Sequence, residues 1–383
     1  MTEAREATEA VRRVTTPVGD PAWLVSRYDL VRSLLADPRL GRTHPNPAQA
    51  ARFSEAAFFS TPEQATPEEE RVAHARFRRL LARSFSARRM ERLRPRIMSI
   101  TTEMLDALEA MTPPVDFHEA VSFPLPALVI SELLGVPYED RNDFRRWSDD
   151  AAHMDDGERS TAGLQSLFMY MYALIERKRE EPGQDVISDL LAFAQQDESM
   201  TEMEVAQLGG GLLFAGHITT VNAIDEGVFL FLTHPGQREA LVANPSLVPS
   251  AIEEILRYPD PARSARRREG GLPRYAASDI EVEGMTIPAG DLVLLSLEAA
   301  NSDEATFPDA CTFDPSRTDN PHMTFGHGSR YCIGAPLARM ELECVFSTLF
   351  QRFSTLELAV PPQEIVRRTN VLAGGFESLP VRW

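Results

Sequence analysis

Cysteine is scarce in this chain of 383 residues, where it occurs three times, as Cys311, Cys332 and Cys344. Three thiols cannot form a fully paired disulfide framework, and no two of them have the CxxC spacing of a redox or zinc motif. Reduced thiols are typical of proteins that work in the cytosol. We therefore expect a cytoplasmic protein.

Long apolar segments are missing as well. The first residues, MTEAREATEA, are polar and charged, so they lack the apolar region of a secretory signal, and we expect residues 1–10 to be disordered. The most apolar stretches, near 208–216 and 227–232, are short and are separated by charged residues such as Asp225 and Glu226. Neither reaches the run of about 20 apolar residues that crosses a bilayer, so we expect no membrane segment.

Positive charge is in deficit, because 39 Lys and Arg stand against 57 Asp and Glu and give a net charge of −18. Such a chain repels phosphates, which argues against a nucleic-acid-binding protein. Segment 71–96 is the exception, since its only acid is Glu91. A run of this kind is usually a solvated helix face, but on an acidic protein it can also steer an acidic partner. Its arginines are Arg71, Arg76, Arg78, Arg79, Arg83, Arg88, Arg89, Arg92, Arg94 and Arg96.

Apolar residues at helical spacing dominate the first two-thirds of the chain. After Pro259, an alternating pattern around Gly284 predicts a hairpin and 292–297 predicts a short strand, before a final helix over 336–352. No internal repeat or linker separates these regions, so we predict one domain over 1–383 that is mainly α with small β-sheet regions. The earlier predicted helices are 27–36, 72–83, 88–110, 117–134, 162–180, 185–196 and the long, mostly apolar 202–233.

The segment Phe325–Gly334, FGHGSRYCIG, is the most informative in the chain. Cys332 lies there in a glycine-rich loop that runs directly into a helix with Pro336 near its start. The free N–H groups and positive dipole end of such a helix stabilise a thiolate, and Gly334 lets the backbone approach a flat ligand closely. Taken alone, however, a single cysteine is more often inert core.

Two other interpretations of the glycine-rich segments are weaker. A zinc site from His322, His327 and Cys332 would lack a fourth ligand at a familiar spacing. Neither this loop nor Gly209–Gly211 carries the GKS/T ending of a phosphate-binding loop.

The cysteine segment resembles the haem-binding signature of the cytochrome P450 family, Phe-x-x-Gly-x-Arg/His-x-Cys-x-Gly. The resemblance implies the cytochrome P450 fold over nearly the whole chain, from Pro17 to Trp383, with haem b (iron protoporphyrin IX) as cofactor. Cys332 would then be the thiolate ligand of the iron, and Arg330 would pair with a haem propionate. Such a thiolate pushes electron density toward bound oxygen and favours O–O cleavage. The matching positions are Phe325, Gly328, Arg330, Cys332 and Gly334.

Further cations fit the same resemblance. His74 and Arg78 are four residues apart on a predicted helix, where two cations repel unless an anion lies between them. The resemblance implies that both donate to the haem propionates and that Arg274 is another propionate arginine.

A carboxylate and two arginines resemble the structural network of the same family. Glu254 and Arg257 match its Glu-x-x-Arg motif, and with Arg317 they imply a buried network that positions the thiolate loop. Alone, such a pair is usually a solvated surface pair of little energetic value.

Ala215–Thr220, AGHITT, resembles the oxygen-binding motif of the family, Ala-Gly-x-acid-Thr. Gly216 would loosen the helix beside bound dioxygen. Thr219 would hydrogen-bond the dioxygen and help to deliver protons, whereas on its own it would be read as a threonine bonded to its own helix. The sequence departs from the motif at Ile218, which stands in place of the usual acid and cannot relay protons. Asp225 lies two turns further along roughly the same face.

The resemblance is closest to soluble bacterial members that act on natural products. It implies a monooxygenase, which we expect to be monomeric, that receives electrons from a separate ferredoxin and ferredoxin reductase. The arginine-rich segment 71–96 would dock the acidic ferredoxin, and a small, mostly hydrophobic substrate would be oxidised. The expected substrate pocket draws on 45–66, 144–172, 212–220, the segment after Pro259 and Leu372–Phe376.

The role of one basic segment and the outcome of the oxidation both stay open. Arg263 and Arg266 belong to a basic segment that is read first as a solvated loop and second as a contact to an anionic substrate. Ile218 keeps open an oxidative rearrangement, coupling or desaturation without net oxygen insertion. A haem- or ligand-binding protein without turnover is a third hypothesis, against which Thr219 beside Gly216 counts.

Overall fold

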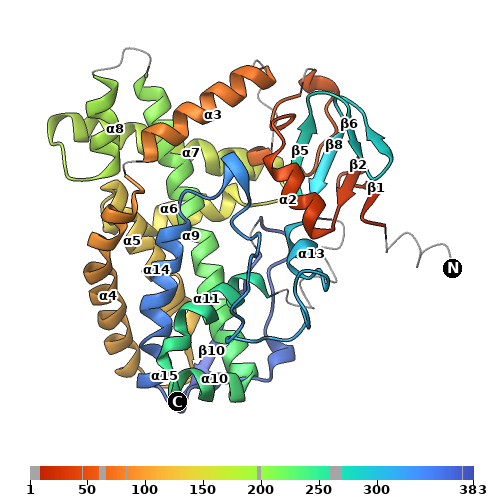
Figure 1. Cartoon of the computed structure of the whole chain (residues 1–383). Coiled ribbons are helices and arrows are strands. Elements are labelled where there is room, and N and C mark those ends of the chain that lie inside the picture. The colour runs from red at the N-terminus through yellow and green to blue at the C-terminus, as the bar shows by residue number, and fades with distance from the viewer. Residues whose placement is uncertain are drawn as a thin grey trace. The chain divides into compact units, whose positions relative to one another are not determined.

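The computed structural model describes residues 9–44, 46–59, 66–82, 84–195, 200–258, 270–372 and 374–383 (Figure 1). The chain divides into two compact units, each assembled from segments that are far apart in the sequence. The first unit comprises Met1–Glu55, Phe59–Arg79 and Leu256–Ile333, and the second comprises Ala56–Phe58, Leu80–Ile255 and Gly334–Trp383.

Some predictions fall on residues outside this description. They are most of the predicted disordered segment 1–10, part of the pocket segment 45–66, Arg83, the basic segment that contains Arg263 and Arg266, and residue 373 of the pocket segment Leu372–Phe376.

The first unit is built on a five-stranded sheet. β2 and β8 run parallel, and the other neighbours are antiparallel. Every residue of β8 is buried, as expected of a central strand with four consecutive aliphatic residues. In order across the sheet, the strands are β1 (Val11–Thr15), β2 (Pro21–Val25), β8 (Leu292–Leu295), β5 (Leu272–Ala276) and β3 (Leu40–Gly41).

A hairpin of β6 (Ile280–Val282) and β7 (Met285–Ile287) confirms the pattern that was predicted around Gly284. Its two turn residues, Glu283 and Gly284, have φ angles of 50° and 74°, which matches a primed two-residue turn. The helices of this unit are α2 (Tyr28–Ala36), most of α3 (Pro67–Ala82) and α13 (Leu297–Asn301).

The second unit is mainly helical and also contains a three-stranded sheet of β4 (Val115–Asp116), β10 (Pro380–Arg382) and β9 (Glu357–Leu358). Its helices are α4 (Ala87–Glu109), α5 (Pro124–Leu134), α6 (Arg141–Ala151), α7 (Gly157–Glu180), α8 (Val186–Ala194), α9 (Glu202–Thr233), α10 (Pro235–Ala243), most of α11 (Val248–Arg257), α14 (Ala335–Phe346) and α15 (Leu349–Arg352). Short turns of 3-10 or π type are η1 (Pro47–Gln49), η2 (Ala57–Phe59), η3 (His118–Ser122), η4 (Tyr138–Asp140), η5 (Pro245–Leu247), η6 (Gly328–Arg330) and η7 (Pro362–Glu364) across the two units.

Helix α9 is the central element of the second unit, where α5, α7 and α14 pack against it (Figure 1). It begins with a capping box in which the Thr201 side chain and the Glu204 side chain each bond the other's backbone. Gly209 allows a close approach, since a Cβ atom there would lie 2.7 Å from Met171. The predicted boundaries of this helix, 202–233, are confirmed.

The fold class, mainly α with small β regions, is confirmed, and some element boundaries differ from prediction. The helix predicted over 117–134 is interrupted, because Pro124 lacks the N–H that would continue it, so the π turn η3 precedes α5. Helix α3 begins at Pro67 rather than at residue 72, since proline and three glutamates suit a first turn. None of the helices formed by the described residues is long and apolar enough to cross a membrane.

Candidate functional site

The loop that carries Cys332 has a fixed backbone in the first unit. Gly326 and Gly328 adopt φ angles of 73° and 70°, which glycine reaches without strain. The Cys332 N–H donates to the Phe325 carbonyl at 2.8 Å. A Cβ atom on Gly328 would lie 3.0 Å from the Cα of Ala36, so the loop also approaches α2 closely. The Cys332 thiol is exposed at the end of this turn.

Polar contacts that were not predicted hold the segment before this loop. The Asn301 side chain accepts from the Met323 N–H at 2.7 Å and donates to the Thr324 hydroxyl at 2.9 Å. Thr324 donates in turn to the Leu256 carbonyl at 2.7 Å, and Arg257 donates to the Asn301 carbonyl at 2.9 Å. Asn301 and Thr324 have no motif spacing that would have revealed this role.

The residues of the predicted network are Glu254, Arg257 and Arg317. Glu254 and Arg257 are fully buried, which excludes the alternative of a solvated surface pair. Arg317 donates to the carbonyls of Pro308 at 3.0 Å and Asp309 at 3.3 Å.

The other two cysteines have different surroundings. Cys344 is buried in α14, and burial raises the pKa of its thiol to about 11, so it stays protonated near neutral pH. Cys311 is exposed in a loop, and its backbone carbonyl accepts a hydrogen bond from the Tyr258 hydroxyl. No three His, Cys, Asp or Glu side chains of the described residues come together as a metal site, so the zinc interpretation of His322, His327 and Cys332 finds no support.

Five cations gather in the first unit around one acid, Glu70 of α3. Arg330 donates to Glu70 at 2.5 Å, and both side chains are largely buried. Arg78 reaches the same loop, because it donates to the Tyr331 carbonyl at 2.8 Å. We call this set the cation cluster. Its members are the predicted His74, Arg78, Arg274 and Arg330, together with Arg42.

The cation cluster holds more positive charge than Glu70 can offset. Burial, with smaller contributions from the nearby Arg330 and Arg42, lowers the pKa of Arg274 to about 9. Burial also lowers the pKa of His74, and Arg330 adds to that effect. A group of cations that disfavour one another's charged forms is the arrangement expected of a site for an anion.

Gly216 and Thr219 lie on α9 in the second unit. A Cβ atom on Gly216 would lie 2.8 Å from the Ile130 side chain, so glycine is required here for the packing of α5. The Thr219 hydroxyl donates to the Ala215 carbonyl at 2.9 Å, but its side chain is exposed, unlike that of most α9 residues. The exposed residues recur every four positions on one face of the helix, at Gln207, Gly211, Ala215 and Thr219.

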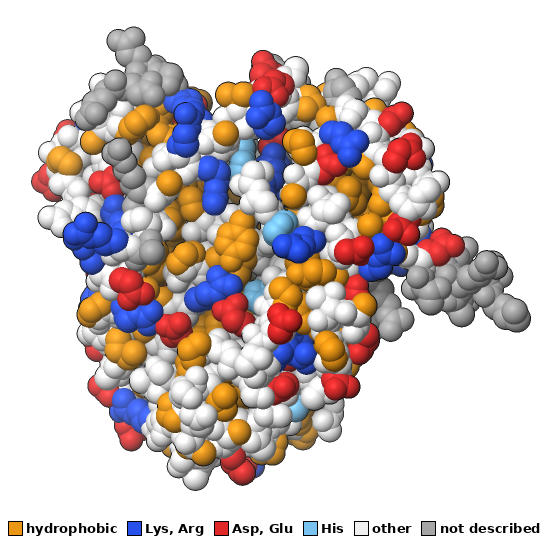
Figure 2. Space-filling model, viewed as in Figure 1, with side chains coloured by type: hydrophobic (Ala, Val, Ile, Leu, Met, Phe, Trp, Pro, Cys, Tyr) orange, Lys and Arg blue, Asp and Glu red, His pale blue; other side chains and the backbone are white. Residues whose placement is uncertain are grey.

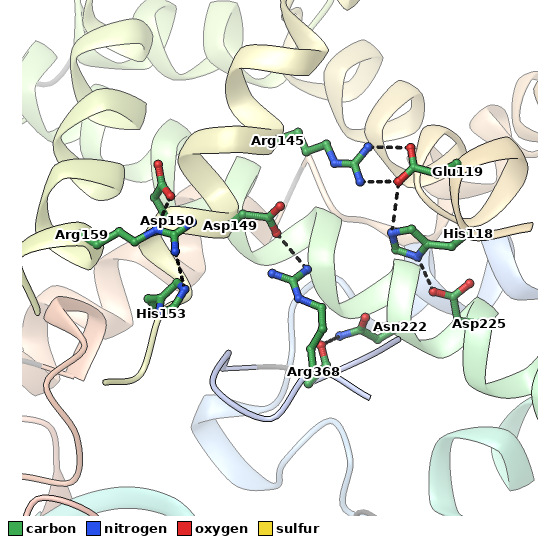
Figure 3. A network of polar contacts seen from close by, with 11 residues as sticks. His118, Glu119, Arg145, Asp149, Asp150, His153, Arg159, Asn222, Asp225 and Arg368 are labelled. Atoms are coloured by element: carbon green, nitrogen blue, oxygen red, sulfur yellow. Dashed lines mark hydrogen bonds and ion pairs between the residues drawn. The ribbon is translucent and has the colours of Figure 1, made fainter. Parts of the chain in front are cut away.

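Asp225 does not share this open face. It is fully buried, and its Oδ2 lies 2.7 Å from Nδ1 of His118 in η3 (Figure 3). His118 is followed by Glu119, which accepts two hydrogen bonds from Arg145 at 2.8 and 2.5 Å. Polar side chains therefore extend from an exposed carboxylate to the buried part of α9.

Two predicted pocket segments meet in the second unit, at the end of α6. The Leu372 N–H donates to the Ala152 carbonyl at 2.8 Å, and His153 forms a β-bridge with Val371. Asp149 accepts from Arg368 at 3.2 Å (Figure 3). Segments 144–172 and 372–376 are thus joined by backbone and side-chain contacts.

The arginine-rich segment 71–96 divides into paired and unpaired residues. Arg71, Arg89, Arg94 and Arg96 form ion pairs, so much of the predicted basic surface is neutralised locally. Figure 2 accordingly shows basic and acidic side chains interspersed on the face that it presents. Within the part of the chain that the structure describes, the exposed arginines of the segment without an ion pair are Arg79, Arg88 and Arg92.

Comparisons with known proteins identify the family of the chain. The model of the family described as Cytochrome P450 matches residues 155–373. Pentalenolactone synthase of Streptomyces exfoliatus is 43% identical over 372 residues, which cover 96% of this chain and 92% of that protein. Mycinamicin IV hydroxylase/epoxidase of Micromonospora griseorubida is 40% identical over 387 residues, which cover 99% and 94%.

Solved structures give the same result. A putative thioether synthase involved in the tailoring step of griseoviridin has a TM-score of 0.89 and 36% identity, and the match covers 100% of this chain and 95% of that chain. The substrate-free cytochrome P450 described as a pimaricin epoxidase has a TM-score of 0.85 and 40% identity, with 100% and 94% covered. The chain therefore belongs to the cytochrome P450 family, as the cysteine segment predicted, and is a haem-thiolate monooxygenase.

Proposed function

We propose that this enzyme binds haem b through the thiolate of Cys332 and inserts one oxygen atom of dioxygen into a small, mostly hydrophobic molecule. The cation cluster is the observation that carries the proposal. Its four arginines and His74 lie with one acid in the same unit as the Cys332 loop. Three of these cations, Arg42, His74 and Arg274, have lowered pKa values. A haem carries two propionates, which would supply the negative charge that this cluster lacks.

The residues that would hold the haem follow from this geometry. His74, Arg78, Arg274 and Arg330 would bind the propionates, while Phe325 and Gly334 border the loop of the ligand Cys332. When bound, the haem supplies oxygen activation, which a thiolate ligand favours by donating electron density.

Helix α9 would contribute the residues on the oxygen side. Thr219 exposes its hydroxyl on the open face, where it can hydrogen-bond a ligand after leaving the Ala215 carbonyl. Because Gly216 has no side chain, α9 can pack closely against α5 at this position. Thr219 would hold a proton at its hydroxyl on the side where oxygen would be activated, and Gly216 would set the shape of the helix there.

The partners and the substrate class are also part of this proposal. We infer that a separate ferredoxin with its reductase delivers electrons, with Arg88 and Arg92 as docking cations, to a monomeric cytoplasmic enzyme that works as one domain. The relatives named above are a synthase, a hydroxylase/epoxidase and an epoxidase of natural products, which supports a natural-product-like substrate.

A second outcome is favoured by Ile218. Without the usual acid beside Thr219, proton supply differs from that of an ordinary hydroxylase, so oxidative rearrangement, coupling or desaturation remains the alternative reaction. Turnover under labelled dioxygen separates the two. One labelled oxygen atom in the product is expected, and an oxidised product without label would replace simple insertion by the alternative.

The central assignment is tested by the spectrum of the reduced carbon-monoxide complex. We expect a Soret band near 450 nm in the wild type, which is the signature of a thiolate ligand. Cys332→Ala should lose that band, whereas Cys311→Ala, which also removes an exposed thiol, should keep it. A haem-loaded wild type without the band would overturn the assignment of Cys332.

A further inference from the structure

Ile218 stands where the family motif has an acid, so this position of α9 has no side chain that can pass a proton. Polar residues lie further along the same face of the helix. Positions 218, 222 and 225 are spaced i, i+4 and i+7, so Ile218, Asn222 and Asp225 share one face. Asn222 and Asp225 are both buried. The rise of an α-helix places Asp225 about 10 Å from Ile218 along the axis. A buried acid therefore lies two turns from the position where one is missing.

Asp225 forms a close pair with His118. The Oδ2–Nδ1 distance is 2.7 Å, Asp225 is fully buried and His118 is 6% exposed. Burial lowers the pKa of His118, but Asp225, Asp116 and Glu119 raise it by more, so the net shift is upward. Burial raises the pKa of Asp225, which His118 and the Ser122 hydroxyl oppose. The pKa values of both groups are therefore raised, and the two titrate as a coupled pair.

The outer end of this pair reaches solvent. Nε2 of His118 lies 4.0 Å from Oε1 of Glu119, whose side chain is 50% exposed. A single water molecule can bridge a gap of that length. Arg145 of α6 fixes Glu119 by two hydrogen bonds, so the carboxylate is held at the mouth of the path (Figure 3). His118 itself lies in a π turn, a geometry that is frequent at functional sites.

The inner end contains buried polar atoms without an ordinary hydrogen bond. Within the described residues, these are Oδ1 of Asp225, the Ser122 hydroxyl and both ring nitrogens of His217. His217 precedes Ile218 and packs edge-on against Phe123, with ring centroids 4.6 Å apart. Burial lowers the pKa of His217 to about 3, so it is neutral and offers one acceptor and one donor. Buried polar atoms of this kind are usually satisfied by internal water.

From these observations, we propose that Glu119, His118 and Asp225 form a proton-entry path to α9 that replaces the acid missing at Ile218. The inference rests on the proposed oxygen chemistry of the enzyme. Water molecules bonded to Asp225, Ser122 and His217 continue the path toward the Ile218–Thr219 turn. His118 and Asp225 act through these groups, so they are positioning residues and not catalytic ones.

Each cycle of the path transfers one proton from solvent to the internal water beside α9, and no electrons are transferred. A proton from solvent reaches Nε2 of His118 through water bonded to Glu119, which stays a carboxylate because Arg145 lowers its pKa. The proton on Nδ1 then passes to Oδ2 of Asp225. Asp225 then releases a proton to the internal water, which restores its carboxylate. Exchange with water, in which Nε2 gives up one proton and Nδ1 takes up another, then returns the ring to its first tautomer.

A neighbouring pair distinguishes proton transfer from a purely structural role. Glu226 follows Asp225 on α9, is also buried, and accepts from Arg367 at 3.1 Å. An arginine does not release its proton near neutral pH, so this pair can anchor the helix but cannot relay protons. Glu226→Gln is therefore a matched control for Asp225→Asn.

The experiment compares both variants with the wild type in turnover driven by dioxygen and in turnover driven by hydrogen peroxide. In Asp225→Asn we expect the fraction of reducing equivalents that appear in product to fall about tenfold and the solvent isotope effect to rise. Peroxide-driven turnover should stay within about twofold, because peroxide already brings its protons. Asp225→Glu should restore coupling, and Glu226→Gln should retain it.

A measurement without turnover keeps the inference separate from the enzyme's activity. The nitrogen-15 shifts of the His118 ring should show a shared Nδ1 proton in the wild type that is lost in Asp225→Asn. Unchanged coupling and isotope effect in Asp225→Asn would overturn the path, as would equal losses in Asp225→Asn and Glu226→Gln. Loss of the 450 nm band in the wild type would instead contradict the proposed function.

Discussion

At the scale of single residues, the cation cluster shows how a binding site differs from a stabilising ion-pair network. Glu70 pairs with Arg330, but it cannot satisfy His74, Arg78, Arg274 and Arg42 as well. Burial, together with the neighbouring cations, lowers the pKa of Arg274 to about 9 and also lowers the pKa of His74. The cluster therefore costs folding free energy until an anion joins it.

Arg330→Gln tests this account with two readouts. Losing a charge-assisted hydrogen bond of about 1.5–3 kcal/mol should speed haem loss about ten- to hundredfold, measured by transfer to an acceptor protein. The pKa of His74 in the haem-free protein should rise, since a neighbouring cation is removed, and a proton NMR titration reports it. Arg32→Gln, an exposed arginine on α2, is the control and should change neither quantity.

Part of this site could be predicted from single residues. His74 and Arg78 could be found because two cations at i, i+4 are unfavourable without an anion, and Cys332 because its glycines and spacing fit a motif. Glu70 could not be separated from its neighbours Glu68 and Glu69, which lie in the first turn of the same helix. Asn301 and Thr324 could not be predicted either, since their contacts join segments whose pairing the sequence does not reveal.

At the scale of elements, the Cys332 loop depends on glycine for two distinct reasons. Gly328 has a positive φ and lies against Ala36, whereas Gly284 in the β6–β7 turn has a positive φ and open space around it. Comparing alanine substitutions at the two glycines therefore separates the energetic cost of the left-handed backbone from the cost of a steric clash.

Gly328→Ala should therefore be more damaging than Gly284→Ala. Both variants should lose about 1–2 kcal/mol from the left-handed backbone. Gly328→Ala adds a Cβ atom 3.0 Å from the Ala36 Cα, so we expect a further loss of stability and a weaker 450 nm band. Thermal unfolding and the carbon-monoxide spectrum measure these effects, and equal behaviour of the two variants would contradict a close contact between the loop and α2.

The elements were predictable where one local signal dominates. Helix α9 has a capping box, an apolar run and a proline after its end, and its predicted bounds are correct. Strands β1 and β2 were missed because five-residue strands carry too few alternations to be distinguished from loops. Helix α6 was missed because its face toward the protein is narrow, with Phe144, Ser148 and Ala151 as its buried residues.

At the scale of the whole molecule, a net charge of −18 makes any exposed, unpaired cation significant for an acidic partner. Arg88 and Arg92 lie one turn apart on α4, and both are exposed. We expect Arg92→Glu to lower the second-order rate of reduction by ferredoxin about tenfold at low salt, and less at high salt, where charges are screened. Stopped-flow reduction measures the rate.

The control for this charge reversal is Arg32→Glu, which changes an exposed arginine on α2 by the same two charge units. It should leave the rate of reduction within about twofold, because long-range net charge alone has a weak effect in the presence of salt. Equal slowing by both variants would mean that ferredoxin responds to total charge and does not dock at α4.

The parallel pairing of β2 with β8 has a consequence for how the chain is made. Trp23 of β2 donates to Asp291, which lies 268 residues later, at 2.8 Å. During synthesis the N-terminal strands must therefore wait for most of the chain to leave the ribosome before their sheet can close. Contacts of such long sequence separation fold slowly, and an unpaired strand edge favours aggregation during the delay. Low growth temperature and abundant chaperone should therefore raise the yield of native enzyme more than a stronger promoter does.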